Sequence, residues 1–177
     1  SLYKTTDGRH FVVISSVLYR VILPEYSQTL VKVLTTNARV YYAEHNGDLY
    51  YSNGQDCGRI AADNTWFPWA LPSPNAPVVA AIAGTLPPGR YRVAITYSNS
   101  ITGEEGGTKG ATQFALSAIG ALRVTLPGPV PGATHIRVYV SNINGGAACL
   151  YASLAVGTSY CDISSLPIDS APLQTDG

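Results

Sequence analysis

Residues 41–56 read YYAEHNGDLYYSNGQD, and this stretch predicts a β-hairpin. Asn46-Gly47 is the preferred pair for a type I′ turn, because both central residues of that turn need a positive φ. Strands are expected on either side of it, at residues 39–43 and 48–52. Side chains of a strand alternate between its two faces, so the crowded tyrosines divide between them. The tyrosines are therefore expected to be mainly core and sheet-face residues.

The composition extends the β prediction to the whole chain of 177 residues. Only 12% of the residues are charged, while Gly 17, Pro 12 and Tyr 12 favour strands separated by turns. A formal net charge of zero argues against a nucleic-acid partner, which would require a basic field. No apolar run approaches the roughly 18 residues that span a bilayer, and the first residues do not resemble a signal peptide. The absence of an initiator Met is typical of a fragment or a processed piece.

Turn and proline signals divide the chain into four parts. An N-terminal antiparallel β-meander is expected over residues 1–66, a Pro-rich linker over 67–77, a β-sandwich over 78–165 and a C-terminal extension over 166–177. The remaining meander strands are expected at 10–15, 17–23 and 29–34. The sandwich strands are expected at 78–83, 91–97, 112–117, 122–126, 136–141, 148–154 and 159–163. The fold class is therefore all-β, because short alternating strands account for both regions.

A short internal echo marks the N-terminal region. The run from Leu2, LYKTTDG, recurs from Leu49 as LYYSNG, an offset of 49 − 2 = 47 residues. A period of about 40–50 residues with four strands is typical of propeller blades. Together with Trp66, the pattern resembles the blade-ending strands of β-propellers, including those of phage structural proteins. The resemblance covers residues 1–66 and implies a propeller-blade-like meander. Further blades would lie upstream or in another chain, since one blade does not bury its faces alone.

A second resemblance covers residues 76–163. Residues 86–97, LPPGRYRVAITY, followed by GEEG at 103–106, resemble the G-x-Y-x-V-x-V … G-E-S hairpin of fibronectin type III-like modules. The segments IRVYVS at 136–141, LYA at 150–152 and GTSY at 157–160 resemble the other half of such modules in phage and bacterial extracellular proteins. The resemblance implies a fibronectin type III/immunoglobulin-like β-sandwich. The hairpin that normally ends the module comes early, which implies a permuted or phage-specific variant.

Motifs for catalysis or metal binding are absent from the sequence. It has no nucleophile elbow, P-loop or zinc-protease motif, so no cofactor, metal or enzymatic activity is expected. Three widely spaced histidines lack partners at ligand spacing: His10, His45 and His135. Cys149 and Cys161 fall in strands that could be neighbours, so one disulfide is possible. The alternative, which we favour, is that these two and Cys57 are half-buried thiols that behave as small apolar groups.

Several charged residues allow two interpretations each. Glu44 and Asp48 flank the hairpin turn and could act as a glycosidase pair, or they could keep the hairpin tip soluble, which we favour. The loop from Asn53 to Asp56 offers few oxygens for calcium. Four arginines are expected on the outer sandwich face, where they form a groove for polyanions or simply cover the sheet with their stems: Arg90, Arg92, Arg123 and Arg137.

Three aromatic residues at the region boundary are the candidate ligand-binding site. Trp66, Phe67 and Trp69 could form a stacking platform for sugar rings, because aromatic faces bind at low entropic cost. They could equally pack between the two regions. Proline-locked aromatics at a join favour this second interpretation.

These observations lead to two principal hypotheses of function. The first is a non-enzymatic structural component of a bacteriophage tail or tail-tip/fibre assembly, a scaffold or connector that could also attach to the host surface. Its partners would be other virion subunits in an oligomeric assembly, with a host-surface glycan as a further ligand, and its location would be the virion. The alternative is a carbohydrate-binding or adhesin module of a secreted bacterial protein, which would be extracellular.

Overall fold

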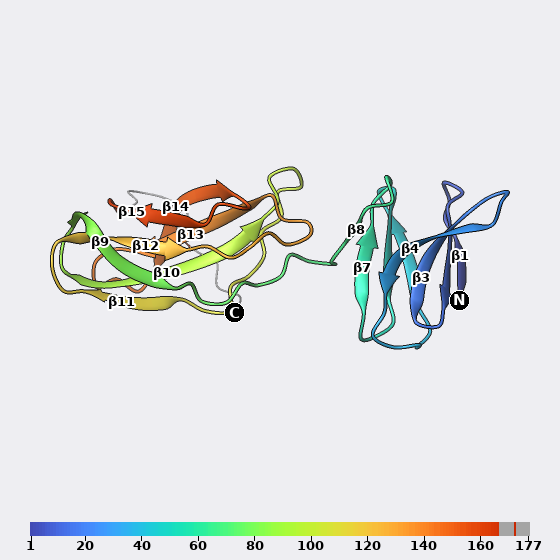
Figure 1. Cartoon of the computed structure of the whole chain (residues 1–177), viewed down its shortest axis with the longest axis horizontal. Coiled ribbons are helices and arrows are strands. Elements are labelled where there is room, and N and C mark those ends of the chain that lie inside the picture. Colours follow the sequence, from blue (N-terminus) through green and yellow to red (C-terminus); the bar gives the residue numbers. More distant parts are fainter. Residues whose placement is uncertain (167–171, 173–177) are drawn as a thin grey trace. The chain divides into compact units, whose positions relative to one another are not determined.

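A computed structural model describes residues 1–166 and residue 172. The chain forms two compact units, Ser1–Ala70 and Leu71–Gly177 (Figure 1). The described residues contain fifteen β-strands and no helix, so none of them forms a helix that could cross a membrane. The antiparallel pairing confirms the all-β prediction.

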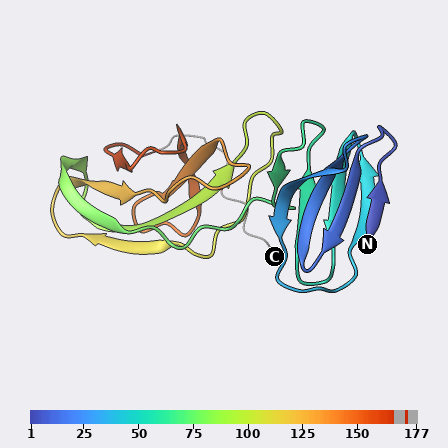
Figure 2. The same cartoon turned by 45° about the vertical axis from the view of Figure 1, so that its right-hand side comes forward.

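The first unit consists of two four-stranded antiparallel meanders, where the sequence predicted a single blade-like one (Figure 2). In each meander every strand pairs with the next one along the chain. The strands of the first sheet are β1 (Leu2–Lys4), β2 (His10–Ile14), β3 (Val17–Ile22) and β4 (Ser27–Val33). Those of the second sheet are β5 (Tyr41–His45), β6 (Asp48–Ser52), β7 (Cys57–Ile60) and β8 (Trp66–Phe67).

The predicted hairpin turn joins β5 to β6. Asn46 and Gly47 have φ of 51° and 82°, as a type I′ turn requires. The alternation along β6 places Leu49 and Tyr51 in the core, at 0% and 2% exposure, while Tyr50 lies on the outer face. The echo with offset 47 does not relate equivalent strands, because Leu2 is in an edge strand and Leu49 in a central one.

The two sheets of the first unit share one hydrophobic core. Its buried members come from both sheets and from the connection between them: Phe11, Leu18, Leu34, Val40, Leu49, Tyr51 and Ile60. Trp66 packs against this core and donates a hydrogen bond from Nε1 to the Tyr51 hydroxyl at 2.8 Å. Gly58 lies beneath both rings, since a Cβ at this position would come within 2.6 Å of Trp66 Nε1 and 2.8 Å of the Tyr51 ring. Trp66 therefore closes the core of the first unit.

The second unit is a β-sandwich of a four-stranded and a three-stranded sheet. The first has the order β11-β10-β13-β14 and the second β15-β12-β9. The strands are β9 (Val79–Leu86), β10 (Gly89–Ser98), β11 (Thr112–Leu116), β12 (Gly120–Thr125), β13 (His135–Ser141), β14 (Ala148–Ala155) and β15 (Tyr160–Ile163). Each of the seven overlaps a predicted strand. The core between the sheets includes Tyr91, Val93, Leu122, Val138 and Ile163.

The segment between β10 and β11 covers part of the outer face of the four-stranded sheet. Glu105 pairs with Ser98 in an isolated β-bridge, and its carboxylate accepts hydrogen bonds at 2.5 Å from the Thr96 and Tyr139 hydroxyls. Burial, with the neighbouring Glu105 carboxylate, raises the pKa of Tyr139 to about 12. As a result β10 is buried on both faces at Thr96, which is 1% exposed.

Candidate functional site

The predicted aromatic platform is not formed as a single surface. Trp66 and Phe67 are consecutive in β8, so their side chains project from opposite faces of the sheet. Trp66 faces the core, and the Lys32 ammonium of β4 lies 4.0 Å from its ring centroid. The half-buried Trp66 ring packs against the core of the first unit, and its contribution to a ligand platform stays a prediction.

The outer face of the second sheet retains the other two predicted aromatics. Phe67 pairs across from Arg59, whose guanidinium carbon lies 5.0 Å from the Phe67 ring centroid. Trp69 is 53% exposed, and its ring centroid lies 6.2 Å from that of Tyr50, with the two planes tilted by 57°. A half-exposed Trp69 beside Tyr50 offers aromatic surface to solvent, which suits contact with an apolar ring face of a ligand.

The candidate catalytic carboxylates do not converge. Asp48 is the cross-strand partner of His45, the neighbour of Glu44, so the carboxylates of Glu44 and Asp48 lie on opposite faces of the sheet. Asp48 forms an ion pair with Arg59 at 3.0 Å. A glycosidase pair needs two carboxylates about 5–9 Å apart in one cleft, so this geometry excludes the pairing.

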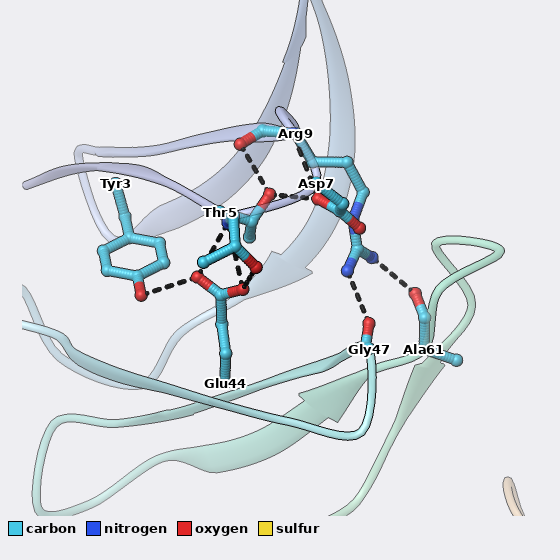
Figure 3. Close-up of polar contacts among 8 residues, drawn as sticks. Tyr3, Thr5, Asp7, Arg9, Glu44, Gly47 and Ala61 are labelled. Atoms are coloured by element: carbon cyan, nitrogen blue, oxygen red, sulfur yellow. Dashed lines mark hydrogen bonds and ion pairs between the residues drawn. The ribbon is translucent and has the colours of Figure 1, made fainter.

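Glu44 instead holds the two sheets of the first unit together (Figure 3). Its carboxylate accepts hydrogen bonds from the Tyr3 hydroxyl at 2.9 Å, the Thr6 backbone N–H at 3.0 Å and the Thr6 hydroxyl at 2.5 Å. The Tyr3 ring also stacks on Tyr42, with 4.7 Å between centroids. The hydrogen bonds from Thr6, and then that from Tyr3, lower the pKa of the Glu44 carboxyl.

Arg9 makes the second part of this polar network. Its guanidinium donates to the carbonyl oxygens of Ala61 and Gly47, both at 2.7 Å, and its Nε donates to Asp7 at 2.8 Å (Figure 3). Asp7 in turn accepts a hydrogen bond from the Thr5 hydroxyl. All these groups satisfy one another, so the network joins the two sheets and leaves no charged group directed at a ligand.

The loop from Asn53 to Asp56 is a turn that uses its own oxygens. Asp56 accepts hydrogen bonds from the Thr35 backbone N–H at 2.9 Å, the Thr35 hydroxyl at 2.7 Å and the Asn53 amide at 3.0 Å. Burial raises the pKa of Asp56, but the Thr35 hydrogen bonds outweigh it and the pKa is lowered. Within the described residues no group of three or more His, Cys, Asp or Glu could hold a metal.

Cys149 and Cys161 do not form the disulfide that the sequence allowed. Cys149 lies in β14 and Cys161 in β15, which belong to different sheets of the sandwich. All three cysteines are free thiols, but they are not equally buried as expected: Cys57 is exposed, Cys149 intermediate and Cys161 buried. The histidines likewise lie in three separate strands, β2, β5 and β13.

An extensive exposed apolar surface lies on the outer face of the first sheet, a feature that the sequence analysis missed. One cross-strand row runs through Leu2, Val12, Tyr19 and Leu30, and another through Ile14, Val17 and Val33. We call these seven residues the outer β1–β4 face. Their strongest signal in the sequence is that β2 and β3 carry apolar residues at nearly every position, as strands buried on both faces do.

The exposure of this face is unusual for a solvated sheet. Leu2 is 73% exposed, Val33 61%, Leu30 59% and Ile14 46%. The adjacent row carries the titratable groups Lys4 and His10 at one end, followed by Val21 and Gln28. A contiguous apolar surface of this kind marks an interaction site more often than isolated exposed residues do.

No family model, curated protein or solved structure matches the chain. The candidate sites therefore depend on the geometry of the described residues alone.

Proposed function

We propose that the chain is a structural component of a bacteriophage tail or tail-tip/fibre assembly, acting as a scaffold or connector between subunits. The observation that carries the proposal is the outer β1–β4 face, which exposes two rows of apolar side chains. The occupant that we assign to this face is a second copy of the chain. The fibronectin type III-like motifs of the second unit support the assignment to a tail, and the proposed role is non-catalytic.

The chemistry of the face favours association of identical copies. Its two apolar rows carry no charged residue, so two copies meet without repulsion between like charges. Complete burial of a large aliphatic side chain contributes about 1.5–3 kcal/mol. At the exposures of Leu2, Ile14, Leu30 and Val33, covering them contributes roughly 4–7 kcal/mol per copy. Two copies thus contribute roughly 8–14 kcal/mol, which is comparable to an association cost of about 4–15 kcal/mol and predicts a weak, reversible contact that many repeats in an assembly would reinforce.

Analytical ultracentrifugation tests the proposal. The wild-type chain is expected to self-associate with rising concentration, whereas Leu30→Lys/Val33→Lys stays monomeric because two charges would be buried. The matched control is Ile101→Lys/Ile119→Lys, which changes two apolar side chains of the second unit that are 86% and 71% exposed. A wild-type chain that is monomeric at every concentration, or a control that is disrupted equally, contradicts the proposal.

The Tyr50–Trp69 pair favours a second candidate, a carbohydrate-binding or adhesin module acting outside the cell. Trp69 is 53% exposed and offers the accessible aromatic surface that such a module needs. On a glycan array, binding that disappears in Trp69→Ala and persists in Tyr41→Ala supports this function. Tyr41 is a suitable control because it is 64% exposed and belongs to the same sheet as Tyr50. Absent binding, or binding indifferent to the Trp69 change, rejects it.

A further inference from the structure

Arg90 and Arg92 lie on the outer face at the start of β10. Their neighbours Tyr91 and Val93 are fully buried in the sandwich core, so the two arginines project to the opposite side of the strand. Residues two apart on a strand are about 6.5–7 Å apart, which brings both guanidinium groups over one patch of the sheet. Gln113 of β11 pairs with Arg92 across the strands and shares this face.

The loop between β13 and β14 closes the patch into a pocket. The Asn144 backbone N–H donates to the Arg90 carbonyl at 2.8 Å, and the Asn144 Oδ1 accepts from the Arg90 backbone N–H at 3.1 Å. Ile143 packs closely against Gly89: a Cβ added at Gly89 would lie 2.4 Å from the Ile143 side chain. The resulting pocket has a volume of about 350 Å³ and is lined by Arg90, Arg92, Gln113, Asn144 and Gly145.

The lining of this pocket is rich in hydrogen-bond donors. Asn144 uses its side-chain oxygen on the Arg90 backbone, so its amide nitrogen remains available to donate. Arg92 donates one hydrogen bond from its guanidinium, to the Gly146 carbonyl at 2.9 Å. A guanidinium carries five N–H donors, which leaves Arg92 with several to offer. Among the residues that the structure describes, no carboxylate lines the pocket.

The other two arginines of the expected outer group behave differently. Arg123 forms two hydrogen bonds with Asp162, at 2.7 and 2.6 Å, and Arg137 pairs with Glu105 at 2.5 Å. Within residues 1–166 and 172, Arg90 and Arg92 have no such acidic partner. Two cationic groups, for which the described part of the chain supplies no ion-pair partner, therefore gather at one pocket in a chain of zero formal net charge.

We propose that this pocket binds an oxyanion, the carboxylate or phosphate group of a small polar ligand such as an acidic sugar unit. The planar guanidinium fork matches the two oxygens of a carboxylate or phosphate, and the charge strengthens each hydrogen bond. The pocket volume lies at the lower end of the range for small-molecule sites, which suits one sugar residue or a phosphate. The site is on the second unit and is independent of the proposed assembly through the first.

Backbone amide NMR of the isotope-labelled full chain at low ionic strength tests the proposal. The probes are glucuronate, inorganic phosphate and glucose. Saturable shifts are expected with at least one of the two anions at Arg90, Arg92, Gln113, Asn144 and Gly145, and none with glucose. Shifts with glucuronate alone identify a carboxylate ligand, and shifts with phosphate alone identify a phosphate ligand. Added sodium chloride should weaken binding, because screening reduces the attraction between charges.

Two variants separate the site from general charge effects. Arg90→Ala/Arg92→Ala should weaken binding at least tenfold, whereas Lys4→Ala, an exposed cation of the first unit, should leave it unchanged. Gln113→Glu keeps both arginines and places a carboxylate in the pocket, so it should also abolish binding. No saturable shift with either anion, an equal response to glucose, or binding that the arginine changes do not affect overturns the proposal.

Discussion

Replacing Gly58 by alanine is expected to destabilise the first unit strongly. The added Cβ would lie 2.6 Å from Trp66 Nε1 and 2.8 Å from the Cε1 and hydroxyl of Tyr51. Both rings are rigid and are joined by their own hydrogen bond of 2.8 Å, so neither turns aside cheaply. Overpacking a core costs about 1–3 kcal/mol, and loss of the hydrogen bond adds about 1 kcal/mol. The expected loss in the free energy of unfolding is therefore about 2–4 kcal/mol, a large share of what about 70 residues provide.

Tryptophan fluorescence reports this loss selectively, because the only two tryptophans, Trp66 and Trp69, both lie in the first unit. Urea unfolding in a Trp69→Phe background isolates the Trp66 signal. The Gly58→Ala curve should shift to lower urea, with altered native emission from the displaced ring. Adding Tyr51→Phe removes the hydroxyl contact and should recover part of the loss.

The matched control is Gly128→Ala, followed by circular dichroism. Gly128 has no atom within 4 Å of an added Cβ, so its change should stay within about 0.5 kcal/mol. A Gly58→Ala protein with wild-type emission and a change below about 0.5 kcal/mol would refute the packing argument.

Three further predictions concern stability and reactivity. The pKa of Glu44 is lower in the folded chain than in the unfolded chain. Its contribution to the free energy of unfolding is therefore fully present above the unfolded-state pKa and is lost as the pH falls through the folded-state pKa. Stability of the wild type, measured by urea unfolding from pH 6 to pH 3, should therefore fall more steeply than that of Glu44→Gln, and parallel profiles would contradict this. Cys57 should react quickly with a thiol reagent, whereas Cys161, whose pKa burial raises to about 11, should react only after unfolding; equal rates in the native chain would be inconsistent with this burial. Gly84→Ala should lower the melting temperature of the second unit, because its Cβ would lie 2.4 Å from Ala121 Cβ, and an unchanged melt by circular dichroism would reject that contact.

The fold could be predicted where the local pattern is strong. The Asn46-Gly47 turn specified its hairpin, although β5 extends to His45 because the two-residue loop pairs His45 with Asp48. The sandwich strands could be found because large apolar residues such as Tyr91 and Val93 alternate along the sequence with polar or small ones. Strand β7 was missed, since Gly58 has little strand preference of its own. Position 58 requires glycine because the Trp66 and Tyr51 rings leave no room for a Cβ there, and no local sequence pattern reveals this contact.

The candidate sites were less predictable because they depend on partners distant in the sequence. Trp66 and Phe67 looked equivalent as neighbouring aromatics, and only the orientation of β8 separates a core residue from an outer one. Arg92 and Arg123 also looked equivalent. What distinguishes them is Asp162, 39 residues from Arg123, whereas no carboxylate within residues 1–166 and 172 lines the pocket at Arg92.

The different strand connections of the two units imply different folding rates. In the first unit every pairing joins strands that follow each other along the chain, so each step closes only a short loop. In the second unit β9 pairs with β12, and β10 pairs with β13 across more than thirty residues, as in Thr96 with Arg137. Chains with such distant contacts fold more slowly. During refolding, fluorescence from the first unit should therefore reach its native value before the sandwich has formed.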